Sequence, residues 1–109
     1  MAPRRRSDAV LQELAAYFRL LAEPARLQIL EVLAGGELSV LAIVAATGLK
    51  QAHVSRQLGR MAGEGLLARR KEGTRVYYAL KDPRLADLLK TAERSLKEHL
   101  RGRLGGLSS

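Results

Sequence analysis

Apolar residues recur every three or four positions in five stretches of the chain, the spacing of helices that bury one face. The helices predicted on this basis cover residues 8–22, 24–34, 40–47, 51–64 and 82–101. The pattern then changes between the fourth and fifth helices. Residues 74–80 are rich in β-branched and aromatic residues, and with residues 66–71 across the Glu72-Gly73 turn they predict a β-hairpin. The chain is therefore expected to be mainly α with a small β-hairpin.

Residues at the helix ends support these boundaries. Ser7 or Asp8 can cap the first helix, Pro24 suits the first turn of the second, and Ser39 can cap the third. In the second helix, we expect Leu27, Leu30, Val32 and Leu33 to pack inward and Arg26 and Gln28 to face solvent. Glu37-Leu38 is read as a short extended link.

The third and fourth helices are joined by a short turn. Thr47-Gly48 closes the third helix, and Gly48 can take the positive φ that a tight turn requires. Leu49 is expected to anchor the turn in the core. Gly65 ends the fourth helix. This arrangement predicts a helix-turn-helix in which residues 51–64 form the outer helix.

The two faces of this outer helix differ in chemistry. One apolar stripe contains Val54, Leu58 and Met61, and another face contains His53, Arg56, Gln57 and Arg60. This second face has no carboxylate, whereas a solvated polar face usually mixes both charge signs. Arginine pairs bidentately with guanine and glutamine with adenine, so the face suits the major groove of DNA.

Positive charge is concentrated around the outer helix and the hairpin. Of the 109 residues, 19 are basic and 11 acidic, a net charge of +8 with a pI near 10.6. Seven basic and two acidic residues lie between Lys50 and Arg75, so this segment carries +5 of the total. A basic hairpin directly after a recognition helix is typical of the wing of a winged helix-turn-helix, which contacts phosphates or the minor groove.

Composition excludes several other classes. The absence of cysteine excludes disulfides, thiolate metal sites and thiol redox sensing. No apolar run approaches the roughly 20 residues that span a bilayer, and no secretory signal is recognisable, so we expect a cytoplasmic protein without membrane contact. No catalytic triad, P-loop or H-E-x-x-H motif is present, so an enzyme is not expected.

A chain of this length is expected to form one domain, which we predict to cover residues 8–101. Residues 1–7 are expected to form a disordered basic arm that either solubilises the chain or lies on DNA, and residues 102–109 a flexible tail. The first and last helices carry more apolar surface than one small core needs, which predicts a homodimer through these helices. The interface residues expected on this basis are Leu11, Leu14, Phe18, Leu85, Leu88, Leu89, Ala92 and Leu96. The alternative is that the last helix packs back on its own domain.

Three phrases together resemble the ArsR/SmtB family of dimeric bacterial transcription regulators: LAEPARLQILEVL at 21–33, GLKQAHVSRQLGRMAGEGLL at 48–67 and RKEGTRVYYAL at 70–80. The resemblance covers about residues 8–101. It implies a winged-helix homodimer on a pseudo-palindromic operator, which it usually represses until an effector binds. Charge and resemblance together place the DNA contacts on Lys50, Gln51, His53, Ser55, Arg56, Gln57, Arg60, Arg69, Arg70, Lys71, Thr74 and Arg75. The family's usual residue at Gln57 is His, so base preference can differ there.

The chain departs from the metal-sensing members of this family. Their Cys-x-Cys positions hold Ser39 and Leu41, and the neighbouring aspartate position holds Ala42. Other members bind metals through the last helix, where the remaining candidates are Asp87, Glu98 and His99. Adjacent Glu98 and His99 diverge by about 100° around a helix and do not converge on one ion unaided. No metal site is therefore assigned, although a divalent ion such as Ni, Co or Zn stays open as an effector.

Two functional hypotheses follow from the sequence. The leading one is a sequence-specific, dimeric DNA-binding regulator of transcription. Its signal is a metal ion, a small organic molecule or a partner protein, or it has none. The alternative is a winged-helix interaction protein that binds nucleic acid non-specifically or is modulated by a partner. The ratio of affinities for specific and scrambled DNA distinguishes the two hypotheses.

Overall fold

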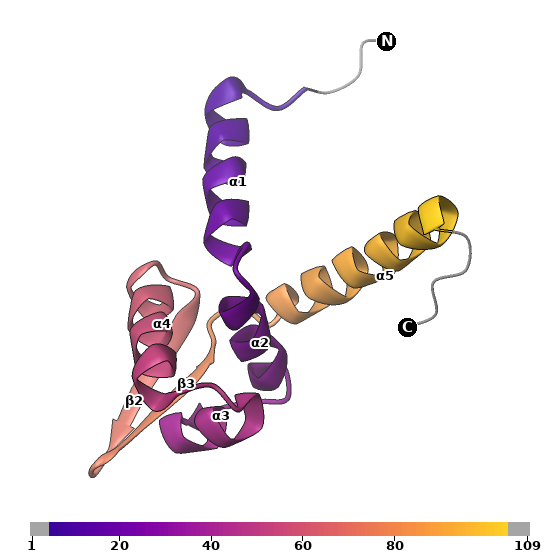
Figure 1. Cartoon of the computed structure of the whole chain (residues 1–109). Coiled ribbons are helices and arrows are strands. Elements are labelled where there is room, and N and C mark those ends of the chain that lie inside the picture. Colours follow the sequence, from indigo (N-terminus) through magenta and orange to yellow (C-terminus); the bar gives the residue numbers. More distant parts are fainter. Residues whose placement is uncertain (1–4, 105–109) are drawn as a thin grey trace.

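The computed structural model describes residues 5–104, and within them the chain forms five helices and three strands (Figure 1). In chain order these are α1 (Asp8–Leu21), α2 (Pro24–Leu33), β1 (Leu38–Ser39), α3 (Val40–Thr47), α4 (Gln51–Gly63), β2 (Leu67–Glu72), β3 (Arg75–Leu80) and α5 (Arg84–Leu104). The predicted helices and hairpin are all present, with ends shifted by a few residues at most. The largest shift is at α5, which continues three residues beyond its predicted end.

Local chemistry sets several of these boundaries. The Ser7 hydroxyl accepts a hydrogen bond from the Val10 N–H at 3.2 Å, and the Ser39 hydroxyl accepts one from the Ala42 N–H at 3.1 Å. Gly48 ends α3 with a φ of 71°, a left-handed conformation that strains residues with a β-carbon. The predicted caps and turn are therefore confirmed.

The core lies where α2, α3 and α4 meet. Its completely buried side chains are Ile29, Leu30, Ile43, Val54, Leu58 and Met61. Leu66 and Leu67 after α4, together with Tyr78 on β3, extend this core toward the hairpin. The helix-turn-helix and the hairpin are consequently one packed unit.

The hairpin belongs to a three-stranded antiparallel sheet in the order β1-β3-β2. Leu38 of β1 pairs with Tyr78, and Ser39 pairs with Tyr77. A short link was predicted for this segment, because a two-residue strand is too short to show a period of two.

The inner face of α2 differs from the prediction. Ile29 is completely buried and Leu27 is 40% exposed, while Arg26, expected to face solvent, is only 8% exposed. Arg26, Leu30 and Leu33 are spaced at i, i+4 and i+7, so they share the inward face. The prediction was wrong because an inward arginine requires polar partners that only the folded chain supplies.

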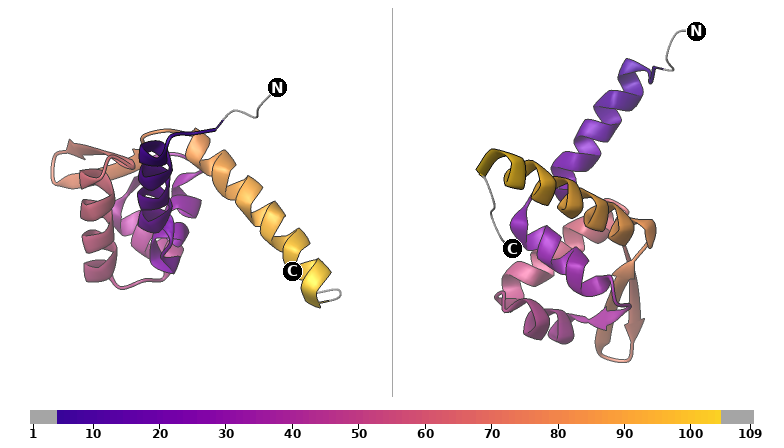
Figure 2. Two further views of the ribbon diagram at one scale, coloured as in Figure 1. Left: turned by 90° about the horizontal axis from the view of Figure 1, so that it is seen from above. Right: turned by 90° about the vertical axis from the view of Figure 1, so that its right-hand side faces the viewer.

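Helices α1 and α5 extend away from this unit in different directions (Figures 1 and 2). The radius of gyration is 16.6 Å, against about 13 Å for a compact chain of this length. Large apolar side chains are exposed on both helices: Val10, Leu11, Leu14, Tyr17, Phe18, Leu88 and Leu96. No helix among residues 5–104 is long and apolar enough to cross a membrane.

One residue predicted for the dimer interface, Leu85, is only 4% exposed and belongs to the core of its own domain. Leu89 is half-buried against this core and also lines a groove between α2 and α5. The first turns of α5 therefore pack on their own domain, because they follow β3 directly. The exposed Leu88, Ala92 and Leu96 remain available to a partner.

Only part of each predicted terminal segment lies within the described residues. Residues 1–4 of the expected arm and residues 105–109 of the expected tail lie outside them. Arg5 forms an ion pair with Asp8 at 3.0 Å between exposed side chains. Residues 102–104, expected in the tail, are the last turn of α5.

Ile43 and Leu41 on α3 provide a matched test of the core, since Ile43 is 0% and Leu41 is 65% exposed. Ile43→Ala is expected to lower the free energy of unfolding by about 2–5 kcal/mol, because it leaves a cavity. Leu41→Ala is expected to change it by less than about 0.5 kcal/mol. Urea unfolding at a fixed protein concentration measures both, and equal losses for the two variants would contradict this assignment of the core.

Candidate nucleic-acid interface

The outward face of α4 is fixed by the burial of its opposite side. Val54, Leu58 and Met61 point into the core, so the residues about half a turn away face solvent. The exposed polar residues of this helix are Gln51, Ser55, Arg56 and Arg60, and Lys50 precedes them as the exposed N-cap residue.

Arg56 lies near the middle of this outward face. Ala52 and Gly59 are its exposed neighbours at i−4 and i+3, so no bulky side chain on these positions shields its guanidinium. Within residues 5–104 no carboxylate is recorded within ion-pair distance of Arg56 or Arg60. Their positive charges are therefore available to an external anion.

Gln57 does not have the free amide that the prediction required. Its carbonyl oxygen accepts a hydrogen bond from Nε of Arg26 at 2.8 Å, and its amide nitrogen donates to Glu23 at 3.0 Å. Gln57 is half-buried because it lies three residues after Val54 and four before Met61, at the edge of the inward face. In this conformation both ends of its amide are hydrogen-bonded, so reading adenine would require Gln57 to leave Arg26 and Glu23. His53 is also half-buried, at the margin of the outward face.

The hairpin carries the remaining predicted DNA contacts. Arg69, Lys71, Thr74 and Arg75 are exposed, and Gly73 turns the hairpin with a φ of 61°. Figure 1 shows the hairpin extending past α4 on the side of α3. The tip of the hairpin lies near the start of α4, because Thr74 and Arg75 line the same hollow as Gln51 and Ser55.

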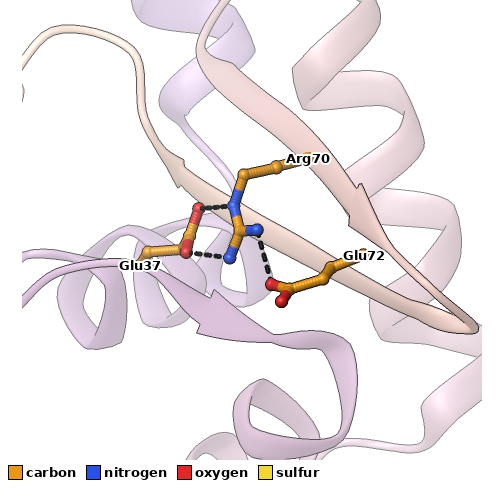
Figure 3. Close-up of polar contacts among 3 residues, drawn as sticks. All are labelled: Glu37, Arg70 and Glu72. Atoms are coloured by element: carbon orange, nitrogen blue, oxygen red, sulfur yellow. Dashed lines mark hydrogen bonds and ion pairs between the residues drawn. The ribbon is translucent and has the colours of Figure 1, made fainter.

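Arg70 differs from its basic neighbours because it is tied to two carboxylates (Figure 3). Its Nε and Nη2 donate to the two carboxylate oxygens of Glu37 at 3.0 and 2.7 Å, and its Nη1 donates to Glu72 at 2.7 Å. The guanidinium also lies 4.6 Å from the ring centroid of Tyr77, a cation–π contact.

These bonds change the expected role of Arg70. The hydrogen bond from Arg70 lowers the pKa of the Glu37 carboxyl, and the bonds from Glu37 and Glu72 raise the pKa of Arg70. Successive strand residues point to opposite sides, so Arg70 faces Tyr77 and Glu72 while Arg69 and Lys71 face the other side. Arg70 therefore fixes the hairpin to the segment before β1 and is not a free phosphate contact. No local sequence signal joins Glu37 to a residue 33 positions away.

A hollow connects the helix face to the hairpin. It measures about 410 Å³. Its lining includes Ser39, Leu41, Gln51, Ser55, Thr74 and Arg75. Four of the predicted DNA-contact residues, from two elements distant in sequence, thus meet around one depression.

The candidate metal ligands are not gathered in the same way. Among residues 5–104 of one chain, no three His, Cys, Asp or Glu side chains lie close enough together to hold a metal ion. All three candidates are exposed on α5, where Asp87 lies 11 residues before the adjacent Glu98 and His99.

A helix-turn-helix with an exposed basic outer helix, followed by a basic hairpin, defines the winged helix-turn-helix class of DNA-binding proteins. The family model of bacterial regulatory proteins, arsR family, matches residues 23–69. Relatives of known sequence and structure match more than nine-tenths of the chain. The chain belongs to the arsR family, and the predicted fold class, family and class of function, a DNA-binding transcription regulator, are confirmed.

Three relatives from mycobacteria illustrate the similarity. The HTH-type transcriptional regulator Rv0324 of Mycobacterium tuberculosis is 39% identical over 95 residues, which are 87% of this chain and 42% of that protein. Rv0081 of the same species, an uncharacterised HTH-type transcriptional regulator, is 33% identical over 93% of this chain and 90% of that protein. The crystal structure of Rv0081 matches with a TM-score of 0.80, covering 91% of this chain and all of that one.

The third relative is a solution structure from Mycobacterium bovis, Mb0332, described as a homodimeric winged helix-turn-helix DNA-binding domain. It is 38% identical with a TM-score of 0.73, covering 94% of this chain and 95% of that one. The chain thus spans nearly all of two solved domains but less than half of Rv0324.

The Glu37–Arg70 pair makes a pH prediction. Folding lowers the pKa of Glu37, so the pair stabilises the native state above the unfolded-state pKa, and this contribution is lost as pH falls through the lower folded value. A ¹³C NMR titration of the side-chain carboxyl is expected to show a midpoint below that of an ordinary glutamate. Arg70→Gln should raise the midpoint toward the ordinary value, whereas Arg69→Gln should leave it nearly unchanged. An ordinary midpoint in the unaltered protein would contradict the pairing.

Proposed function

We propose that this chain is a sequence-specific repressor that binds a pseudo-palindromic DNA operator as a homodimer. The observation that carries the proposal is the outward face of α4: among residues 5–104, Arg56 and Arg60 have no carboxylate within ion-pair distance. On the same helix, Gln51 and Ser55 share the hollow with Thr74 and Arg75 of the hairpin. A major groove of about 12 Å accepts one α-helix, and guanidiniums on its outer side reach guanine edges. The exposed Arg69, Lys71 and Arg75 of the hairpin then lie against the sugar-phosphate backbone or the minor groove.

Dimerisation is supported by the apolar surfaces of α1 and α5. A groove of about 620 Å³ between α2 and α5 is lined mainly by apolar side chains: Leu27, Ala34, Leu89, Ala92 and Leu96, with Glu31, Lys90 and Glu93 at its edges. Monomers rarely leave such a surface open. A two-fold axis would place the two α4 helices about 34 Å apart, one turn of DNA, so the operator is an inverted repeat.

Release from the operator requires a signal, and three kinds of signal fit the proposal. The first is a divalent ion. It would need ligands from two subunits, because within residues 5–104 of one chain no three candidate ligands lie together. A small organic molecule and a regulatory partner protein are the other two. Each must bind the free and DNA-bound forms with different affinity in order to act.

Fluorescence anisotropy tests the proposal directly. The probe is a duplex from the region upstream of the protein's own gene, compared with a scrambled duplex across a series of salt concentrations, with chelator and then with Ni, Co and Zn ions. A specific affinity at least about a thousandfold above the scrambled duplex is expected for a sequence reader. A ratio near one would instead favour the interaction protein with non-specific nucleic-acid binding.

Arg56 and Arg75 are expected to contribute in different ways. Arg56→Ala should cost about 1–3 kcal/mol of binding free energy and relax the preference at one base pair, because it removes a base contact. Arg75→Ala should weaken all sequences alike and flatten the slope of log affinity against log salt by about one, because it removes a phosphate contact. Anisotropy on a panel of single-base operator variants measures the base preference, and a salt series measures the slope. Unchanged base preference in Arg56→Ala would place the reading face elsewhere.

Leu96 tests the interface without disturbing the core, since it is 54% exposed on α5. Leu96→Glu is expected to separate the dimer by placing a carboxylate in an apolar interface. Thr91→Glu, at an exposed position on another side of the same helix, should leave the dimer intact. Light scattering over a concentration series measures both, and a Leu96→Glu dimer as tight as the original would place the interface away from this stripe.

A further inference from the structure

Four groups from three elements meet in one polar cluster beneath α4, which we call the Arg26 cluster. It consists of the Arg26 side chain, the Glu23 carboxylate, the Gln57 amide and the Leu20 backbone carbonyl. Arg26 donates from Nε to Gln57 at 2.8 Å and from Nη1 to the Leu20 carbonyl at 2.9 Å, and its Nη2 lies 3.1 Å from Glu23. Gln57 closes the ring by donating to Glu23 at 3.0 Å.

The sequence at the α1–α2 junction leaves these groups in need of partners. Leu20 is in the last turn of α1, where carbonyls lack helical partners, and the residue four positions later is Pro24, which has no N–H. Glu23 is the N-cap residue of α2, yet its carboxylate makes no cap hydrogen bond. Arg26 satisfies both groups, so the junction is held by the same side chain that binds α4.

Burial makes the cluster cooperative. Only 9% of the Arg26 side chain is exposed, against 38% of Glu23. No buried side-chain nitrogen or oxygen among the described residues lacks a partner. Loss of Gln57 or Glu23 would leave a buried guanidinium with fewer acceptors, which costs more than the bond itself contributes. The cluster therefore favours one relative placement of its three elements.

We propose that Gln57 is a positioning residue, and that the Arg26 cluster sets the orientation of α4 relative to the end of α1. This inference rests on the proposed function. In a dimer held through α1, the placement of α4 against α1 decides how far apart the two recognition helices lie. The Arg26 cluster thus contributes to the choice of half-site spacing, while Arg56 and its neighbours choose the bases.

The first experiment needs no DNA. Urea unfolding of Glu23→Gln, Gln57→Ala and the double variant forms a double-mutant cycle, in which residues of one network are non-additive. The unfolding constant of the double variant is expected to differ by about fivefold or more from the product of the single effects. Gln57→Ala paired with Arg75→Ala is the control and should be additive. Additivity in the Glu23–Gln57 pair would overturn the inference whether or not the protein binds an operator.

The second experiment measures the preference for the spacing between the two half-sites of the operator. Anisotropy compares the operator with a duplex carrying one extra base pair between its half-sites, for the unaltered protein and for Gln57→Ala. The variant's preference for the original spacing is expected to fall at least about threefold, with base preference and salt slope unchanged. Loss of preference at a single base pair, with spacing preference intact, would make Gln57 a base reader and overturn the inference.

An exchange of the two side chains provides the rescue. In Glu23→Gln/Gln57→Glu, a carboxylate at position 57 accepts from Arg26 and an amide at position 23 donates to it, so the ring of hydrogen bonds is restored. Gln57→Glu alone places two carboxylates together and should lose spacing preference, which the double variant should recover. Failure of this recovery while Arg56→Ala still shows base-specific effects would reject the cluster and keep the proposed function. Absence of any preference between operator and scrambled duplex in the unaltered protein would reject the proposed function itself.

Discussion

Three side chains on one side of α4 are completely buried, and the rest of the DNA-binding surface depends on their burial. Val54, Leu58 and Met61 pack against α2 and α3, so α4 cannot rotate about its axis without exposing apolar area. Burying each such side chain contributes roughly 1.5–3 kcal/mol. The outward position of Arg56 and Arg60 follows from this packing.

Arginine residues of this chain serve different purposes according to their partners. Arg26 is buried and joins the α1–α2 junction to α4, and Arg70 on β2 is tied to two carboxylates. Arg56 and Arg60 are exposed, and no carboxylate among residues 5–104 lies within ion-pair distance of them. A count of basic residues therefore overstates the charge available to DNA, because the paired side chains are already neutralised.

Much of the fold could be predicted from the sequence because its signals are local. The apolar spacing in α4, the Ser39 cap and the turn at Gly48 each act within a few residues, and the structure agrees with all three. The outward arginines of α4 followed from the same periodicity. The roles of Arg26, Gln57 and Arg70 could not be predicted in this way, because each of them bonds a side chain 31 to 34 positions away. Strand β1 was not predicted for a related reason: a two-residue strand is defined by its pairing with β3 and not by a local sequence pattern.

The surface of α4 and the hairpin differs in chemistry from the surface of α1 and α5. Helix α4 and the hairpin present polar, basic side chains, whereas α1 and α5 present apolar ones and extend away from that surface (Figure 2). The large exposed apolar side chains of α1 and α5 thus lie on other elements than the basic side chains of α4 and the hairpin, as expected when one surface meets a polyanion and the other a second subunit.

Mapping of amide NMR shifts on adding an operator duplex tests this division most directly. The account predicts the largest changes at residues 50–60 and 69–75, with small changes on the apolar stripe of α5 and at Ile29 and Leu30 in the core. Large changes centred on the α5 stripe, with residues 50–60 unaffected, would contradict it.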